Sequence, residues 1–149
     1  MTDEEFEAWL PRARDAYAED MMRNGGLPED VAVAKAAADT EMLFPAGRPS
    51  PDQSVFVAEA DGIPVGQLWV SERTDAVRRD VLWIFDIRIA EGYRGRGYGR
   101  ETMLRAEEEA RRRGLGRIAL NVFGGNDVAR NLYRSLGYVE TSVVMGKTV

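Results

Sequence analysis

The chain contains no cysteine and no histidine among its 149 residues. Without cysteine it forms no disulfide bond, thiolate nucleophile or cysteine-ligated zinc site. Without histidine it lacks the side chain that most often serves as a general base or metal ligand. Proton transfer must therefore use carboxylates, tyrosine, lysine, a chain terminus or water, and we expect no metal site.

The sequence also lacks any apolar run of the roughly 18–20 residues that a membrane-spanning helix needs. Its first residues are acidic, whereas a signal peptide begins with basic ones. The composition, 44% hydrophobic and 30% charged, is typical of a globular protein, and we predict a single domain over residues 1–149. We therefore expect a cytoplasmic protein without a membrane partner.

The net charge of −5 is unevenly distributed along the chain. Residues 1–92 carry 19 acidic and 9 basic side chains, and residues 93–149 carry 6 and 11. The C-terminal part can therefore face an anion, and the N-terminal part can attract a cation. Solvated faces without any ligand explain the same counts equally well. Overall acidity argues against a nucleic-acid partner.

Two helices are predicted at the start of the chain. Thr2 and Glu5 have the spacing of a capping box, and the first helix should end at Gly25-Gly26. Pro11 is expected to kink or divide this helix. The second helix is predicted from residue 28 to about residue 43.

Strands and helices alternate in the rest of the chain. We predict strands at 54–60, 65–70, 81–89, 118–123 and 138–145, and helices at 98–113 and 126–136. This order indicates an α/β (α+β) fold with a mixed sheet. Glutamates at 107–109 and arginines at 111–113 are expected to form a solvated, helix-supporting face.

The run 81–89 is apolar on both faces, which is typical of a central strand. Strict alternation places Val81, Trp83, Phe85, Ile87 and Ile89 on one face. The other face then carries Leu82, Ile84, Asp86 and Arg88, so that two charges stand at the end of a buried strand.

A glycine-rich loop joins this strand to the next predicted helix. Its backbone amides can converge on an anion at the positive end of the helix dipole. It matches neither a phosphate-binding Walker loop nor the dinucleotide fingerprint, and a flexible surface turn is the alternative. The residues expected to hold a pyrophosphate are Arg94, Gly95, Arg96, Gly97, Tyr98, Gly99 and Arg100.

Two motifs together resemble the GNAT superfamily of N-acetyltransferases. The loop 94–99 is similar to the Arg/Gln-x-x-Gly-x-Gly/Ala loop of that superfamily. The segment 126–138 is similar to its second signature, an Asn-x-x-Ala-x-x-Leu-Tyr helix that leads into Leu-Gly-Tyr. The resemblance covers residues 54–149 well and the first two helices more loosely.

The resemblance implies a GNAT-like, mostly antiparallel sheet flanked by helices, with two splayed central parallel strands that form a coenzyme A cleft. Acetyl-CoA would be the cosubstrate and an amine the acceptor. The pantetheine arm would contact the strand at Ile87, Arg88 and Ile89, and the helix at Asn126, Ala129 and Tyr133.

The implied reaction suits a chain without cysteine or histidine, because an amine can attack the thioester directly. A backbone amide of Ile87 or Ile89 would stabilise the developing negative charge. Tyr133 would protonate the departing thiolate, or it simply packs in the core. Asp86 is the first candidate for the base, since burial should raise its pKa; the alternative is a structural ion pair with Arg88.

The acceptor side is less determined by the sequence. The first two helices offer polar and acidic side chains that would suit a cationic amine, alongside solvated faces as the alternative. Weaker candidates for the base are Glu59 and Glu72. The chain starts directly in a helix and its last strand is short, so a homodimer that completes the open sheet edge is one hypothesis. A non-catalytic CoA-binding sensor is the alternative to the enzyme.

Overall fold

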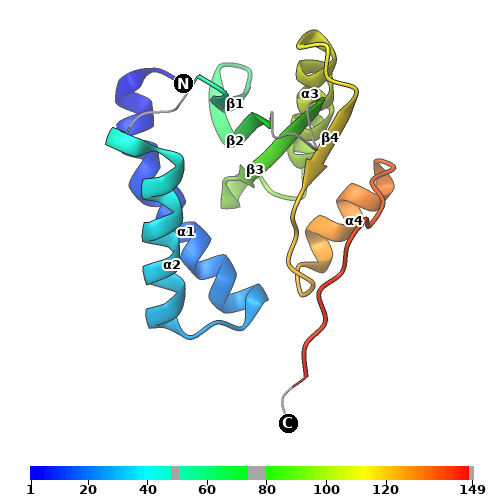
Figure 1. Cartoon of the computed structure of the whole chain (residues 1–149). Coiled ribbons are helices and arrows are strands. Elements are labelled where there is room, and N and C mark those ends of the chain that lie inside the picture. The colour runs from blue at the N-terminus through cyan, green and yellow to red at the C-terminus, as the bar shows by residue number, and fades with distance from the viewer. Residues whose placement is uncertain (48–50, 74–79, 148–149) are drawn as a thin grey trace.

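The computed structural model describes residues 1–47, 51–73 and 80–147 (Figure 1). Its elements, in chain order, are α1 (Asp3–Gly25), α2 (Glu29–Leu43), β1 (Gln53–Ala60), β2 (Ile63–Arg73), β3 (Val81–Ile89), α3 (Tyr98–Arg112), β4 (Arg117–Leu120) and α4 (Asp127–Ser135). Short 3-10 turns occupy Pro45–Gly47 and Glu91–Tyr93. The mixed α/β class predicted from the sequence is confirmed.

Helix α1 begins and ends as its terminal residues predict. The Thr2 hydroxyl accepts a hydrogen bond from the Glu5 amide at 3.2 Å, and the Glu5 carboxylate accepts one from the Thr2 amide at 2.7 Å. Gly26 closes the helix in the left-handed conformation, with φ of 69°. Pro11 lies inside one continuous helix, so the expectation that it divides the helix is wrong.

The sheet has the order β1-β2-β3-β4. The first three strands pair antiparallel, and β3 pairs with β4 in parallel. This confirms a mixed, mostly antiparallel sheet. The parallel pairing runs only from Val81 opposite Arg117 to Ile84 opposite Leu120. Strand β3 therefore continues for five residues beyond its last pair with β4, and the two parallel strands are no longer paired there.

A β-bulge at Phe85 changes which side chains of β3 share a face. Trp69 on β2 pairs with Asp86 and the next residue pairs with Ile84, so the register shifts by one residue at Phe85. Ile84 and Ile87 consequently belong to the same core cluster, although strict alternation predicted opposite faces. That prediction is wrong after residue 84 because the extra residue reverses the alternation.

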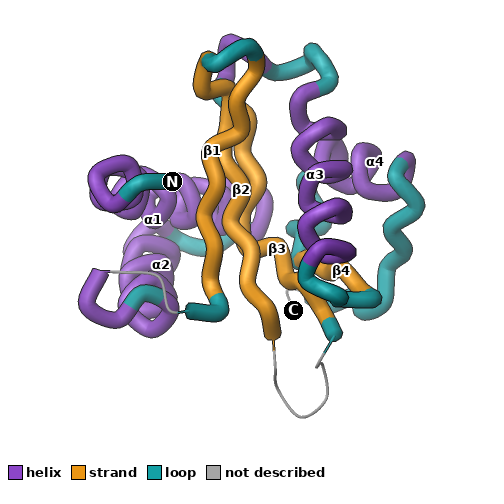
Figure 2. Tube along the Cα trace, turned by 90° about the horizontal axis from the view of Figure 1, so that it is seen from above, coloured by secondary structure: helices purple, strands orange, loops and turns teal. Residues whose placement is uncertain are grey.

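Helices cover both faces of the sheet (Figure 2). Helix α3 packs on one face through a cluster that includes Leu82, Ile84, Met103 and Ala106. The helices α1 and α2 lie on the opposite face, where aromatic rings of Phe6, Trp9, Phe44 and Trp69 make edge-on and tilted contacts. No helix in the described residues has the length and hydropathy that crossing a bilayer needs.

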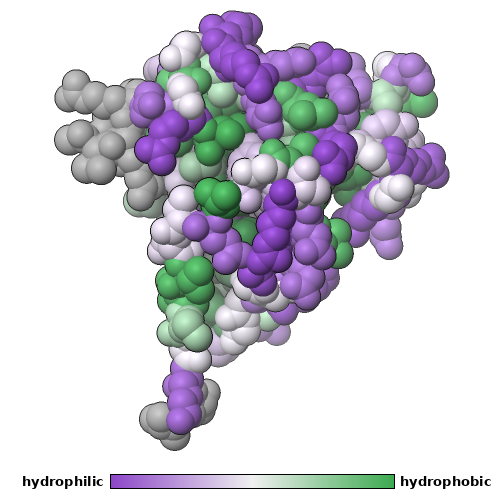
Figure 3. Space-filling model, turned by 90° about the vertical axis from the view of Figure 1, so that its right-hand side faces the viewer, coloured by the Kyte–Doolittle hydropathy of each residue, from purple (hydrophilic) through white to green (hydrophobic). Residues whose placement is uncertain are grey.

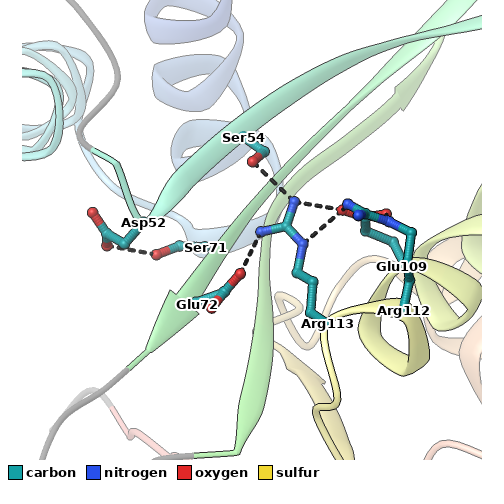
Figure 4. A network of polar contacts seen from close by, with 7 residues as sticks. All are labelled: Asp52, Ser54, Ser71, Glu72, Glu109, Arg112 and Arg113. Atoms are coloured by element: carbon teal, nitrogen blue, oxygen red, sulfur yellow. Dashed lines mark hydrogen bonds and ion pairs between the residues drawn. The ribbon is translucent and has the colours of Figure 1, made fainter.

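Arg113 connects the end of α3 to the sheet (Figure 4). Its guanidinium contacts Glu109 at 2.6 Å, Glu72 at 2.9 Å and the Ser54 hydroxyl at 3.0 Å. The side chains of Arg113 and Glu109 are only 13% and 15% exposed. The expectation of a purely solvated face is therefore wrong for this pair. Glu72, a weak candidate for the base, instead has a structural ion pair.

The predicted last strand is also not found. Residues 138–147 are irregular, and none is assigned to a strand. Strand β4 ends at Leu120, three residues earlier than predicted; residues 121–123 are irregular, and a turn at Gly124-Gly125 precedes α4. The sheet of the described residues therefore ends at β4.

Candidate active site

The glycine-rich loop lies between the end of β3 and the start of α3, as the sequence predicts. Gly95 and Gly97 have positive φ of 74° and 90°, a conformation that residues with a side chain rarely adopt. Among the described residues the N-cap of α3, Gly97, makes no side-chain hydrogen bond, so the first amides of the helix could donate to an anion. A β-carbon at either glycine would meet no atom within 4 Å, which means that the space above the loop is open.

The arginines of the loop differ in what they contact. Arg94 donates from Nε to the Ile89 carbonyl at 3.0 Å and so closes the end of β3. Arg96 lies over the Tyr93 ring, 5.7 Å from its centroid. Arg100 donates to the Ser135 hydroxyl at 2.5 Å and joins the loop to α4. All three arginines are exposed and lie within four residues of Tyr98, where α3 begins.

Helix α4 packs against the start of α3 at Gly99. A β-carbon there would lie 3.4 Å from the Leu132 side chain and 3.9 Å from that of Ile89. The half-buried rings of Tyr93 and Tyr98 flank the loop, 6.3 Å apart and edge-on. Gly99 thus brings β3, α3 and α4 together on one side of the separated strands.

Asp86 lies half-buried on β3, just beyond the point where β4 stops pairing. Its carboxylate accepts a hydrogen bond from Gln67 Nε2 at 2.8 Å. Burial raises the pKa of Asp86, the charge of Asp20 adds to the rise, and the Gln67 hydrogen bond and the Arg88 charge oppose it. The net direction is upward, which is the shift that a general base for an amine requires.

Arg88 lies on the same side of β3 but pairs elsewhere. Its guanidinium contacts Asp20 on α1 at 3.0 Å and the Ala16 carbonyl at 3.5 Å. Within the described residues the ion pair of Arg88 is with Asp20, so the alternative of a structural Asp86–Arg88 pair is not found. The bulge at Phe85 accounts for this arrangement because it turns Asp86 and Arg88 toward α1.

Tyr133 on α4 lies close enough to this group to be affected by its charges. Burial raises the pKa of Tyr133 to about 12, and the carboxylates of Asp86 and Asp20 contribute to the rise. The hydroxyl therefore keeps its proton at neutral pH and is available as a donor. Its ring packs against the α3-facing core and lies 5.9 Å from the ring of Tyr138.

The other predicted residues of α4 cap the helix. The Asn126 side chain accepts a hydrogen bond from the Ala129 amide at 3.1 Å. Its carbonyl oxygen therefore caps the helix, and the amide nitrogen and the second lone pair of the oxygen are the groups that could contact a ligand. The charges of Asp86 and Asp20 thus act on Tyr133, Arg88 pairs with the same Asp20, and the loop 94–100 follows the end of β3.

The acidic and polar residues that the sequence offers for the acceptor side and as weaker bases differ in their contacts and exposure. Asp20 reaches the sheet, whereas Met21 is buried in the contact between α1 and α2. Tyr17 donates to Asp39 at 3.2 Å on the exposed side. Glu19, Glu41 and Glu59 are exposed. Only Asp20 of this set contacts a residue of the candidate site.

Gly66 and Gln67 on β2 belong to the site but were not predicted from the sequence. A β-carbon at Gly66 would lie 2.4 Å from the Arg88 carbonyl oxygen and 2.8 Å from the Ile89 side chain. Glycine is therefore required for β2 to approach the end of β3. A glycine inside a predicted strand is a signal of such close approach.

This arrangement defines a class of protein. A carboxylate with a raised pKa and a protonated tyrosine flank the end of a strand that parts from its parallel neighbour, and an anion-accepting helix N-terminus follows. Such an arrangement is compatible with acyl transfer.

Comparisons with known proteins agree with this class. The model of the acetyltransferase (GNAT) family matches residues 7–138. YycN and YdgE of Bacillus subtilis, both named as uncharacterised N-acetyltransferases, are 32% and 30% identical to the chain over 99% of its length and 94% of theirs. The chain belongs to the GNAT acetyltransferase family and is an acyltransferase.

Solved structures show the same fold. The crystal structure of YycN covers the whole chain and 95% of its own, with a TM-score of 0.91 and 29% identity. A complex of the aminoglycoside N-acetyltransferase AAC(6')-Iy with CoA covers 78% of the chain and 87% of its own, with a TM-score of 0.57 and 22% identity. At that identity the second likeness shows the fold alone.

Proposed function

We propose that the protein transfers an acetyl group from acetyl-CoA to a primary amine of a small molecule or peptide, by direct attack of the amine. The observation that supports this proposal is that Tyr133 lies close enough to Asp86, at the end of β3 beyond its pairing with β4, for the carboxylate charge to raise the pKa of the tyrosine. An acid and a base are thereby available on one reaction site without any nucleophile on the enzyme.

The residues of the candidate site fit coenzyme A. The α3 amides and the exposed Arg94, Arg96 and Arg100 would hold its pyrophosphate, since open space lies above Gly95 and Gly97. Residues 86–89 of β3 lie beyond the last pair that the described residues form with β4, so backbone groups there could bond an extended amide chain. The cosubstrate supplies the acetyl group as a thioester, which an amine can attack.

Asp86 would accept the proton that the acceptor ammonium must lose. Its half-buried carboxylate has a raised pKa, which makes it a better base near neutral pH than an exposed aspartate. The Gln67 hydrogen bond holds the carboxylate in place, and the engaged oxygen is Oδ2. Oδ1 is then the atom available to the acceptor.

Tyr133 would donate its proton to the leaving thiolate. With a pKa raised to about 12, the phenol is fully protonated at neutral pH. A general acid of this kind commonly contributes about 100-fold or more to the rate. The packing of the ring against the core would hold the hydroxyl in one position.

A cationic acceptor is supported by the acids that surround the base. Asp20 and Asp86 both lie at this end of β3, and each raises the pKa of Tyr133 through its charge. Arg88 neutralises Asp20 through their contact at 3.0 Å, so Asp86 is the carboxylate left for an ammonium group.

The direct test is amine-dependent release of free CoA thiol. Because the chain contains no cysteine, a thiol reagent reads only the product. A panel of primary amines, including polyamines, aminoglycosides and peptides with free N-termini, should include members that release thiol in step with N-acetylated product. Binding of acetyl-CoA with no acetylation of any amine would favour the sensor and overturn the catalytic proposal.

A further inference from the structure

Two aromatic side chains lie beside Asp86 and take no part in the proposed proton transfers. Trp69 on β2 pairs with Asp86 in the strand register, and Phe85 directly precedes it on β3. The two rings stack, with centroids 4.6 Å apart and an angle of 19° between their planes. An aromatic stack thus borders the carboxylate that would receive the acceptor amine.

The β-bulge brings the stack and the carboxylate to one face of the sheet. Phe85 contacts Trp69, and Asp86 accepts the hydrogen bond from Gln67. Trp69 and Gln67 are two residues apart on β2 and therefore share a face. This is the face on which α1 lies, because Trp69 also contacts Trp9 of that helix, with 5.8 Å between the ring centroids.

The exposure of the rings in this cluster increases toward Asp86. Trp9 and Phe44 are each 2% exposed, whereas Trp69 and Phe85 are only half-buried. The first two rings fill the core. The two rings next to the carboxylate keep apolar surface, and a ligand that covers it gains free energy of binding.

Trp69 is held in place at the base of the stack. Its indole nitrogen donates a hydrogen bond to the side-chain oxygen of the buried Gln53. Its ring also contacts that of Phe44, with 4.6 Å between the centroids. The stack is therefore formed before any ligand arrives, and little side-chain entropy is lost when one binds.

The surroundings of Asp86 determine the direction in which an acceptor can extend from it. Further along β3 lies the ion pair of Arg88 with Asp20, at 3.0 Å. An apolar group placed over this pair would remove water from two charges, which is unfavourable. An apolar substituent of the amine should therefore lie over Phe85 and Trp69 instead.

The side of the molecule that carries α3 and α4 has a different character. Hydrophilic side chains, purple in Figure 3, cover much of that side. The exposed Arg94, Arg96 and Arg100 belong to the loop before α3 and to its first turn. Positive charge of this kind suits the anionic cosubstrate and repels a cationic amine.

We propose that the Phe85–Trp69 stack is the subsite for the substituent of the acceptor, and that the acceptor is an arylalkylamine. Its primary ammonium would lie at Asp86, and a short carbon chain would join it to an aromatic ring on the stack. This inference rests on the proposed function of the same site and narrows its substrate class. The aromatic ring gains an offset or edge-on contact with Phe85 in addition to the burial of its apolar area.

Equilibrium titration of the full-length chain, with CoA present, tests the subsite separately from catalysis. Phenethylamine should bind about 10-fold or more tightly than putrescine, which has a second ammonium in place of the ring. Phenethyl alcohol has the ring but no ammonium, and it should bind about 10-fold or more weakly than phenethylamine. Equal affinities of the two amines, or no binding of phenethylamine, would overturn the inference.

Amine-dependent thiol release gives the second readout. The ratio of kcat/KM for phenethylamine to kcat/KM for putrescine should fall about 10-fold in Phe85→Leu. Phe85→Tyr keeps the ring and should restore the ratio. The control Phe56→Leu replaces another half-buried phenylalanine, which packs in the core on the α3 face, and should have the wild-type ratio.

The two readouts distinguish a failure of this inference from a failure of the proposed function. Acetylation of both amines with the same ratio in Phe85→Leu and wild type would exclude the aromatic subsite and leave the acetyltransferase activity intact. Preferential binding of phenethylamine without acetylation of any amine would support the subsite and overturn the proposed catalysis.

Discussion

Gln67 on β2 donates a hydrogen bond of 2.8 Å to Asp86 on β3, across the two strands that form the centre of the sheet. The bulge at Phe85 lies next to this pair and turns Asp86 toward α1. A residue outside both signature motifs thus holds the carboxylate on which the proposed chemistry depends.

The hydrogen bond between Gln67 and Asp86 predicts how kcat/KM depends on pH. Asp86 must be ionised to act as a base, so kcat/KM should rise with pH through a pKa above the ordinary aspartate value of about 4. Gln67→Leu removes the hydrogen bond that lowers this pKa, and the acid limb should therefore move to higher pH. Asp86→Asn should remove the limb and most of the activity. A limb at the same pH in wild type and Gln67→Leu would remove Asp86 as its source.

The ionised Asp86 carboxylate should lower the free energy of unfolding at neutral pH. A folded-state pKa above the unfolded value means that Asp86 favours folding only when protonated, and this contribution is lost as the pH rises through the folded pKa. Asp86→Asn should therefore raise Tm at pH 7, while the difference from wild type shrinks at pH values below about 4. An unchanged or lower Tm at pH 7 would mean that the carboxylate is not penalised by burial.

Tyr133 and its neighbour Tyr138 form a matched pair for testing whether Tyr133 is the general acid. Both phenols are partly buried, and burial raises the pKa of each. Tyr133→Phe should lower kcat about 100-fold or more with little change in acetyl-CoA affinity. Tyr138→Phe should leave kcat nearly unchanged, because the Tyr138 hydroxyl is buried without a partner in the described residues. Equal turnover of Tyr133→Phe and wild type would exclude Tyr133 from the mechanism.

Gly66 should be intolerant of even one added methyl group. Alanine would place its β-carbon 2.4 Å from the Arg88 carbonyl oxygen, and backbone must shift to relieve that contact. We expect a loss of about 1–3 kcal/mol in unfolding free energy and a lower kcat/KM for acetyl-CoA, since the end of β3 moves. Gly124→Ala, at an open position, is the control. If Gly66→Ala had the kinetics and Tm of the Gly124→Ala control, the close contact between Gly66 and Arg88 would not determine the position of β3.

Arg113 and Arg112 bind the same glutamate from different environments. The Arg113 side chain is 13% exposed and that of Arg112 is 70% exposed. Arg113→Ala should destabilise the fold by about 2–4 kcal/mol, because Glu109 and Glu72 lose a shared, largely buried cation. Arg112→Ala should change the denaturant midpoint little, since the Arg112 guanidinium is largely exposed and Glu109 keeps its pair with Arg113. Similar midpoints for the two variants would contradict the structural importance of the buried network.

The sequence predicts those parts of the fold that depend on local chemistry. The Thr2–Glu5 capping box, the strand 81–89 and the glycines before α3 are all found where local rules place them. The mixed sheet follows from the order of these elements.

The sequence does not reveal features that depend on distant contacts. The bulge at Phe85 exists only in the pairing of β3 with β2, so alternation along β3 alone assigns Asp86 and Arg88 to the wrong face. The pairing of Arg88 with Asp20 joins residues 68 positions apart. For the segment after Tyr138, strand propensity predicts a strand, but its own chain provides no pairing partner in the described residues.

Calorimetric titration with acetyl-CoA tests the central claim most directly, with NADH and GTP as controls. The account predicts selective binding at micromolar concentration, about −8 kcal/mol. Arg94→Ala/Gly97→Asp should weaken it, whereas Gly137→Asp, at an open glycine with the same φ of 90°, should bind like the wild type. No binding of acetyl-CoA, or equal affinity in both variants, would contradict the assignment of the loop as the site that holds the cosubstrate.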